Sequence, residues 1–177
     1  MTRKVLAMAA SNSRKSINLS LVQYAGGLLE NCEIEYLDLN DFEMPIFSED
    51  IEASSGIPAE ALLFLEKIGE ADALIISFAE HNGGYTVAYK NIFDWASRNR
   101  RDVYQGKPIL MLATSPGPGG AQRVLSTAVD SAEVFSGNVV ASFSLPSFYD
   151  NFDKDKGELV NDELREELRA VVGKLGE

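Results

Sequence analysis

The segment SFAEHNGGY, residues 77–85, combines residue types that could bind a flat, polar ligand. It follows a short apolar run and holds a carboxylate, the chain's only histidine, an asparagine and two adjacent glycines. Glycines let backbone N–H groups approach a ligand that side chains would otherwise keep away. Glu80 and Asn82 add an acceptor and a donor for the edge of a ring. We therefore expect this segment to be a ligand-binding loop.

A second polar segment, SNSRKSINLS at residues 11–20, is typical of a phosphate site at the start of a helix. A helix N-terminus offers unpaired N–H groups and the positive end of the helix dipole. The hydroxyls of Ser11, Ser13 and Ser16 would add donors. The alternative is that Ser16 or Asn18 only caps the helix. Because the segment has neither GxGxxG nor GxxxxGKS/T, it predicts a site for one terminal phosphate rather than a pyrophosphate or triphosphate.

A third polar segment is TSPGPGGAQ, residues 114–122. Its proline and glycine content predicts a rigid turn that presents backbone amides. Taken alone, this sequence could equally be a turn with no ligand. Its interpretation depends on where the other two segments lie.

The elements that must position these segments can be predicted from apolar patterning. Near-continuous apolar runs at residues 5–10, 73–79, 108–114 and 139–145 predict buried parallel strands, and an alternating run at 33–39 predicts a strand nearer an edge. Helical periodicity falls at residues 18–29, 58–68, 86–97, 122–135 and 162–175. The alternation predicts an α/β, doubly wound, five-stranded parallel sheet with helices on both faces. Residues 40–57 are expected to be irregular, a length typical of a lid or an interface segment.

Bulk properties exclude several classes of protein. The length of 177 residues favours a single domain over 1–177, and 45% apolar with 24% charged residues is ordinary for a globular chain. A formal net charge of -11 argues against nucleic-acid binding, which needs a basic surface. The apolar runs are far shorter than the roughly 18 residues of a membrane span, and the first is too short for a signal peptide. We expect a cytoplasmic protein that does not bind membranes.

Other site chemistries find little support in the sequence. A lone cysteine, Cys32, excludes an internal disulfide, and one histidine with one distant cysteine predicts no metal site. A Ser-His-Asp hydrolase would need a GxSxG elbow, which the chain lacks. No side chain is predicted to act as a catalytic acid or base.

When the five predicted strands are numbered along the chain, with the edge strand as the second, the three polar segments follow the first, third and fourth. In open parallel α/β sheets, ligands bind beyond the carboxyl ends of the strands where the strand order reverses. A phosphate at the first segment and a planar heterocycle between the other two would together describe FMN. The cofactor would then carry out the bond chemistry while the protein orients it.

The same segments resemble the motifs of the NADPH-dependent FMN reductase family, a flavodoxin-like group that includes quinone, chromate and azo-dye reductases. The matching stretches are SNSRKSIN at residues 11–18, EHNG at 80–83 continuing to KNIFDW at 90–95, and SPGPGG at 115–120. The resemblance covers about residues 3–145, and KNIFDW is its most specific part. The departures are Ala10 for a usual glycine, a one-residue shift of Arg14, Ala79 for proline and His81 for tyrosine.

The resemblance implies a flavodoxin-like three-layer fold with strand order 2-1-3-4-5. It also implies that FMN is held by Ser11, Ser13, Arg14, Ser16, Ile17, Asn18, Glu80, His81, Asn82, Gly83, Ser115, Pro116, Gly117, Gly119 and Gly120. The implied activity is hydride transfer from NADPH or NADH through flavin N5 to a small acceptor such as a quinone, azo compound, metal oxyanion or free flavin. Arg14, Lys15 or Arg123 could meet the 2′-phosphate of NADPH.

Three questions stay open at this point. The chain could be a non-enzymatic electron carrier like flavodoxin, or an FMN-binding module, rather than a reductase. His81 could pack as the usual tyrosine would, or place a charge near the ring. The aromatic helix at 86–97 could serve only the core, whereas the resemblance implies that its other face meets a second copy in a homodimer or homotetramer.

Overall fold

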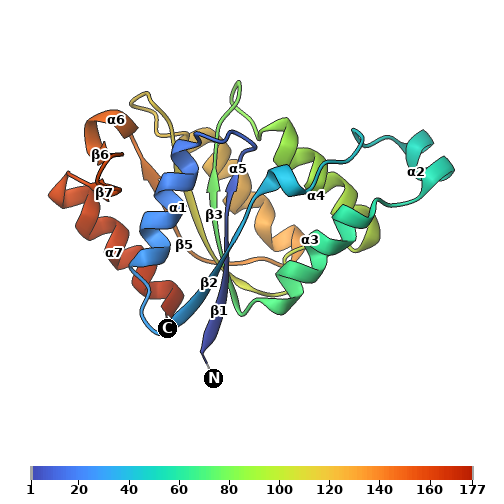
Figure 1. Cartoon of the computed structure of the whole chain (residues 1–177), viewed down its shortest axis with the longest axis horizontal. Helices are drawn as coiled ribbons and strands as arrows, with labels where there is room; N and C mark the ends of the chain where they lie inside the picture. The colour runs from blue at the N-terminus through green and yellow to red at the C-terminus, as the bar shows by residue number, and fades with distance from the viewer. Residues whose placement is uncertain (1, 177) are drawn as a thin grey trace.

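The computed structural model describes residues 2–176 and has a five-stranded parallel sheet at its centre (Figure 1). The strands are β1 (Arg3–Ala10), β2 (Cys32–Leu37), β3 (Ala73–Phe78), β4 (Pro108–Thr114) and β5 (Asn138–Leu145). Their order is β2-β1-β3-β4-β5, and every neighbouring pair is parallel. This confirms the predicted flavodoxin-like sheet.

Helices cover both faces of the sheet, as expected for right-handed crossovers. One face carries α1 (Ile17–Gly27) and α7 (Asp162–Gly176), and the other carries α3 (Ala59–Glu70), α4 (Val87–Asn99) and α5 (Gln122–Ala132). The core is therefore divided by the sheet into two apolar clusters. Each cluster fills the space between one sheet face and its helices.

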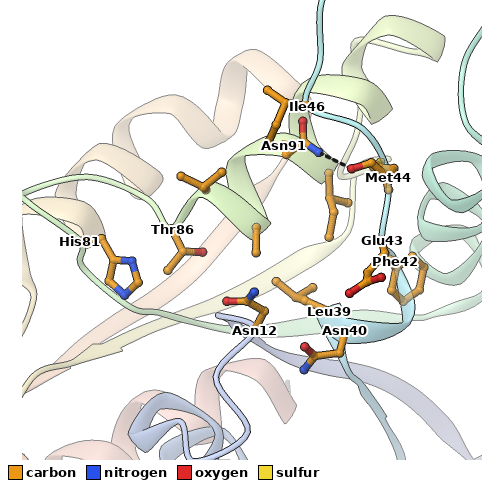
Figure 2. A pocket seen from close by; sticks show the side chains of 13 residues that line it. Asn12, Leu39, Asn40, Phe42, Glu43, Met44, Ile46, His81, Thr86 and Asn91 are labelled. Carbon is orange, nitrogen blue, oxygen red and sulfur yellow. Dashed lines mark hydrogen bonds between the residues drawn. The ribbon is translucent and has the colours of Figure 1, made fainter. Parts of the chain in front are cut away.

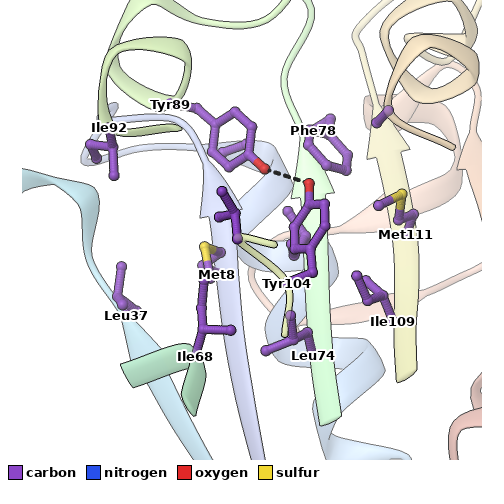
Figure 3. Packing of buried hydrophobic residues seen from close by; sticks show 14 of the residues in the cluster. Met8, Leu37, Ile68, Leu74, Phe78, Tyr89, Ile92, Tyr104, Ile109 and Met111 are labelled. Atoms are coloured by element: carbon purple, nitrogen blue, oxygen red, sulfur yellow. Dashed lines mark hydrogen bonds between the residues drawn. The ribbon is translucent and has the colours of Figure 1, made fainter. Parts of the chain in front are cut away.

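The strands read as continuous apolar runs because both of their faces are covered. In β1, Leu6 and Met8 belong to the cluster under α3, α4 and α5, while Val5 and Ala7 belong to the cluster under α1 and α7. All six residues of β3 are buried. Figure 3 shows the first cluster, where the hydroxyls of Tyr89 and Tyr104 lie 2.9 Å apart and the Phe78 ring packs edge-on against Tyr89.

The segment after β2 is more ordered than predicted. A 3-10 helix, η1 (Leu39–Asp41), ends the strand early, because Asp38 caps it by accepting the Asn40 N–H at 2.9 Å. A short helix, α2 (Glu49–Ser55), is capped by Ser48. The prediction that residues 40–57 are irregular is therefore wrong for these two stretches. α2 has no buried residue and projects from the body (Figure 1).

Several short elements near the C-terminal end were also not predicted. The helix expected at 122–135 ends at Ala132 and continues as a 3-10 turn, η2 (Glu133–Phe135). After β5 come α6 (Phe148–Asn151) and a small antiparallel hairpin of β6 (Phe152–Asp153) and β7 (Glu158–Leu159). None of the helices within residues 2–176 combines the length and apolar character needed to cross a membrane.

Candidate functional site

The three polar segments lie at one edge of the sheet, beyond the carboxyl ends of β1, β3 and β4 (top of Figure 1). We call them loop one (residues 11–16), loop two (79–86) and loop three (115–121). Parallel strands end at the same edge, so loops that are distant in the sequence become neighbours there. The sequence prediction of convergence at this rim is confirmed by the topology.

Loop one turns the chain sharply into α1. The Ser13 carbonyl accepts the Ser16 N–H at 3.1 Å, and Ser11 Oγ accepts the Ser13 N–H at 3.2 Å. Ser16 caps the helix, since its Oγ accepts the Leu19 N–H. Ile17 is the first helical residue, at a position where backbone amides have no partner within the helix. Loop one therefore places three hydroxyls around the positive end of α1.

A cavity of about 230 Å³ opens beside this helix start. Ser11, Ser13, Arg14 and Ser16 all contribute to its wall, together with Asp38 and Asn40 from the segment after β2. Arg14 is exposed and supplies a guanidinium to the same space. The structure thus brings four of the six predicted loop-one residues together around one cavity.

Asn18 has a different place. Its side chain is 2% exposed and lies under the rim, where Nδ2 donates to the Thr114 carbonyl at 3.2 Å. Its Oδ1 accepts the Ser77 hydroxyl at 2.7 Å and the Thr114 N–H at 3.1 Å. Of the two cap alternatives, Ser16 is the cap. The Asn18 amide instead joins α1 to the ends of β3 and β4.

Buried polar side chains gather at this rim. Within residues 2–176 they are Asn18, Ser77, Thr86 and Thr114. Thr86 caps α4 by accepting the Tyr89 N–H at 3.2 Å and donates to the Ala10 carbonyl at 2.9 Å. Thr114 donates to the Leu145 carbonyl at 2.8 Å. These bonds hold the ends of β1, β3, β4 and β5 in register, and sequence reasoning missed their role although Ser77 and Thr114 stand out as polar residues in apolar runs.

Loop two is a tight hairpin. His81 and Gly84 form a bridge, with backbone N···O distances of 3.0 and 3.1 Å. Asn82 and Gly83 have φ of 53° and 82°, the left-handed pair that a type I′ turn requires and that Asn-Gly favours. His81, Asn82 and Gly83 are exposed at the tip. The adjacent glycines therefore serve the turn itself as well as leaving the backbone accessible.

Glu80 is turned toward the start of α5. One of its carboxylate oxygens accepts the Val124 N–H at 3.1 Å. The residue at the N-cap position of α5, Ala121, has φ of 61° and provides no side-chain cap. Glu80 therefore acts as the missing cap from another loop, and a carboxylate is well placed at the positive end of a helix. This contact ties loop two to the element that follows loop three.

Loop three packs on the chain after β5. The carbonyls of Ser115 and Gly117 accept the N–H groups of Phe148 and Ser147, at 3.1 and 2.9 Å. Gly120 is buried with φ of 56°, and a Cβ there would overlap Ser144 Oγ, so only glycine fits. The other predicted residues, Pro116 and Gly119, are exposed on the outer side of the turn. No residue of loop three lines either of the two cavities described at this rim.

A larger cavity of about 620 Å³ lies between loop two, the start of α4 and the segment after β2 (Figure 2). Asn12 and His81 stand at one end, and Met44 and Ile46 at the other. Its lining residues are Asn12, Leu39, Asn40, Phe42, Glu43, Met44, Ile46, His81, Thr86, Val87, Ala88, Asn91 and Ile92. It shares Leu39 and Asn40 with the smaller cavity, so the two adjoin.

The residues of the KNIFDW stretch hold the outer wall of this cavity. Asn91 Oδ1 accepts the Phe47 N–H at 2.8 Å, and its Nδ2 donates to the carbonyls of Pro45 and Met44. Trp95 is fully buried and donates its indole N–H to the Pro45 carbonyl at 2.8 Å. Arg98 pairs with Glu52 at 3.0 Å. We call residues 43–57 the arm; α4 anchors it through these contacts.

The phenols beneath loop two are neutral. Burial raises the pKa of Tyr85, and it raises the pKa of Tyr89 and Tyr104 more strongly because both are fully enclosed. In the part of the chain that the structure describes, no group of three or more His, Cys, Asp or Glu side chains is arranged to hold a metal ion. The charged groups of the site are therefore those that line its two cavities, Arg14 and Asp38 in the smaller and Glu43 in the larger.

A doubly wound sheet with three polar loops at its carboxyl rim defines a flavodoxin-like α/β protein. A family model described as NADPH-dependent FMN reductase matches residues 3–150, and the chain belongs to this family. As a member it is an oxidoreductase that uses FMN and NAD(P)H.

Known proteins resemble the chain to different extents. An NAD(P)H-dependent FMN reductase of Pseudomonas aeruginosa is 36% identical over 121 residues, which are 68% of this chain and only 64% of that protein. An NADPH:quinone oxidoreductase of Arabidopsis thaliana is 28% identical over 180 residues, covering 96% of this chain and 88% of its own. The flavoenzyme NAD(P)H:(acceptor) oxidoreductase FerB of Paracoccus denitrificans superimposes with a TM-score of 0.77 at 24% identity, over 98% of this chain and 95% of FerB, which supports the fold.

Proposed function

We propose that this chain is a reductase that binds FMN at the rim and passes hydride from NAD(P)H to a small oxidised acceptor such as a quinone. The observation that carries the proposal is loop one, where three hydroxyls and Arg14 surround the positive end of α1 beside a cavity. That donor set fits a phosphate, which carries negative charge and accepts several hydrogen bonds. A ligand without a negatively charged group would not need this set of donors.

In this proposal each predicted residue takes a role that agrees with its contacts. Ser11, Ser13, Ser16 and Arg14 donate to the phosphate, joined by the first amides of α1 at Ile17 and Asn18. The Asn18 side chain holds the loop in place, since its amide is already engaged with Ser77 and Thr114. Phosphate binding and helix capping are therefore complementary tasks of neighbouring residues.

The flavin ring is assigned to the space between the tip of loop two and loop three. His81, Asn82 and Gly83 would border it on one side, and the turn Ser115, Pro116, Gly117, Gly119 and Gly120 on the other. Glu80 orients loop two through its bond to α5. Bound FMN would supply the hydride chemistry at N5, so the protein needs no acid or base of its own. Exposed backbone amides at the rim would stabilise negative charge on the reduced ring.

The 620 Å³ cavity favours an enzyme over a pure electron carrier. Small-molecule sites usually have volumes of roughly 300–1,000 Å³ and mix apolar walls with a few polar groups. This cavity adjoins loop one and loop two and has such a lining. We assign it to the nicotinamide and the acceptor in turn. We place the activity in the cytoplasm, where NAD(P)H is supplied.

We also propose that two copies pair through the arm and α4. Ile46 and Val87 are large apolar residues that are 64% and 67% exposed on this face, and α2 contributes no buried residue. An apolar patch on an anchored, projecting segment is typical of an interface. The second copy would cover the solvent side of the large cavity. Sedimentation of the purified protein, compared with an Ile46→Asp variant, tests this pairing.

The deciding experiment for the function is an absorbance spectrum of the purified protein, followed by steady-state oxidation of NADPH and NADH with a quinone. The proposal expects flavin absorbance or stoichiometric reconstitution with FMN, and multiple turnovers without a second protein. Reduction of bound FMN without turnover would identify an electron carrier. A chain that does not bind FMN would overturn the proposal.

A further inference from the structure

The large cavity contains one side chain with a negative charge and no lysine or arginine. Of its lining residues only Glu43 and His81 are ionisable. In Figure 2 the Glu43 carboxylate points from the arm toward the middle of the cavity, facing Leu39 and Asn12. Within residues 2–176, Glu43 takes part in none of the ion pairs and none of the side-chain hydrogen bonds, so no partner offsets its charge.

The polar groups that could bind a ligand in this cavity are few. Thr86 and Asn91 line it, but their side chains are engaged in capping α4 and holding the arm. Asn40 Nδ2 donates to Asp38 Oδ1 at 2.7 Å, while its side-chain oxygen accepts no hydrogen bond from the described residues. Asn12 and His81 remain as donors at one end. The other lining side chains are apolar, which suits a flat ring with one or two carbonyl groups.

Cations stand on two elements that border this cavity: Lys90 on α4, which pairs with Asp94, and two cations in loop one. Arg14 lines the smaller cavity, and Lys15 follows it in the sequence. Asp38, in the same cavity, carries the opposite charge. Under the function proposed above, the FMN phosphate would occupy loop one and offset these cations. Glu43 is then the one acidic side chain in the lining of the large cavity, on a chain whose net charge is already -11.

We propose that the large cavity is an acceptor site for neutral quinones and that Glu43 is its specificity-determining residue, disfavouring anionic acceptors. This inference rests on the function proposed above. The balanced reaction is NAD(P)H + H⁺ + quinone → NAD(P)⁺ + hydroquinone. The hydride brings one proton and two electrons to the quinone, and the second proton comes from solvent. Metal oxyanions and sulfonated dyes, which carry one or more negative charges, would be poor acceptors.

The expected size of the effect follows from Coulomb's law. A unit charge at roughly 7 Å in water changes the encounter with a singly charged acceptor by about two- to three-fold, and the factor multiplies for each further charge. At an ionic strength of about 0.01 M the Debye length is about 30 Å, so this contribution is retained, whereas at about 1 M it is screened. Salt therefore provides an internal test of the electrostatic origin.

The test compares the full chain, loaded with FMN, with its Glu43→Gln and Glu43→Lys variants at saturating NADPH and low ionic strength. The acceptors are a neutral naphthoquinone, a naphthoquinone with one sulfonate, and anthraquinone disulfonate. For each acceptor we take the ratio of kcat/KM for the variant to kcat/KM for the parent, in which the intrinsic reactivity of that acceptor cancels. The ratio should be near one for the neutral quinone, about two to three for the monoanion and about six for the dianion with Glu43→Gln. It should rise further with Glu43→Lys.

The matched control is Glu167→Gln, an exposed carboxylate on α7, on the opposite face of the sheet. It removes the same net charge, so its ratios should not depend on acceptor charge. Equal ratios for all three acceptors in the Glu43 variants, with normal turnover, would overturn this inference and leave the reductase function intact. Absence of FMN binding or of NADPH oxidation in the parent would instead overturn the function itself. A charge dependence that persists in high salt would also contradict the electrostatic role of Glu43.

Discussion

At the scale of single residues, Asn18 connects more of the rim than any other side chain described above. Its amide makes three hydrogen bonds to Ser77 and Thr114, from a helix that begins directly after loop one. Buried polar groups are costly when unpaired, and a network is stable only when all of its members are satisfied. The side chain therefore fixes the distance between loop one and the strands that carry loops two and three.

Replacing Asn18 by Ala should destabilise the fold by about 3 kcal/mol, because a buried hydroxyl and the Thr114 amide and carbonyl would lose partners. Asn18→Asp should be at least as harmful, since a carboxylate would face the Thr114 carbonyl in a buried place. Urea denaturation measures the change. Asn12→Ala, in the exposed part of loop one, is the control and should stay within about 0.5 kcal/mol of the parent. An Asn18→Ala variant as stable as the control would show that the network carries little energy.

Under the proposed function, Ser13 and Ser16 provide a way to separate phosphate binding from helix capping. Ser16 accepts the Leu19 N–H, whereas Ser13 is exposed and does not cap. Ser16→Ala should therefore lower stability by about 1 kcal/mol and also weaken FMN binding. Ser13→Ala should leave stability unchanged while lowering FMN affinity about tenfold, the effect of one charge-assisted hydrogen bond. Quenching of flavin fluorescence gives the affinity. If neither variant alters it, the phosphate lies elsewhere.

At the scale of elements, α4 does two jobs on opposite sides. Tyr89 and Ile92 pack into the core, while Asn91, Trp95 and Arg98 contact the arm. Phe47 completes the contact by meeting the Trp95 ring edge-on, with centroids 5.0 Å apart. Lys90 and Asp94 pair with each other along the helix at 2.7 Å. The arm is thus held by side chains of one helix, without a core of its own.

Asn91→Leu should release the arm without unfolding the domain. The Phe47 N–H and the carbonyls of Pro45 and Met44 would lose their partner, while the leucine keeps a similar volume. Hydrogen exchange measured by mass spectrometry should become about tenfold faster in residues 44–57 and stay unchanged in the sheet, because one hydrogen bond contributes roughly 1 kcal/mol. Lys90→Ala, which removes only a surface ion pair, is the control. Unchanged exchange in the arm would show that Trp95 and Arg98 hold it without Asn91.

At the scale of the whole molecule, the sheet was predictable and the arm was not. A strand that is covered on both faces is apolar along its whole length. β1, β3 and β4 could therefore be located from continuous apolar runs in the sequence. The segment after β2 lacks a periodic apolar stripe: η1 depends on a local cap at Asp38, and the arm depends on the cap of α2 at Ser48 and on contacts from α4.

The site was predictable as a set of loops but not as a set of contacts. The polar loops could be located because each follows an apolar run. The inward turn of Asn18 and the bond from Glu80 to α5 could not, because both join segments more than forty residues apart, with separations of 59 and 44 residues for the shortest contacts. The expectation that one domain spans 1–177 and the roles of the individual FMN-binding residues stay predictions.

The buried tyrosines predict how the fold responds to alkali. Burial raises the pKa of Tyr89 well above its usual value of 10.0, assisted by the neighbouring Tyr104, and burial likewise raises the pKa of Tyr104. In the native state both phenols keep their protons at pH values where the unfolded chain has released them. Their contribution to stability is therefore complete below about pH 10 and falls as pH rises above it.

The free energy of unfolding should accordingly fall above pH 10 by about 1.4 kcal/mol per pH unit for each of these two tyrosines. Tyr89→Phe should remove the contribution of Tyr89 to this slope, so the stability of the variant should depend less on pH in alkali. The variant should also be less stable at neutral pH, because it loses the 2.9 Å hydrogen bond to Tyr104. Urea denaturation across the alkaline range measures the slope, and near-ultraviolet absorbance reports phenolate formation directly. Tyr149→Phe, which removes the hydroxyl of a tyrosine that is 63% exposed, is the control. If phenolate forms at Tyr89 or Tyr104 before the fold is lost, the first apolar cluster opens more readily than its complete burial implies, and the predicted slope would be absent.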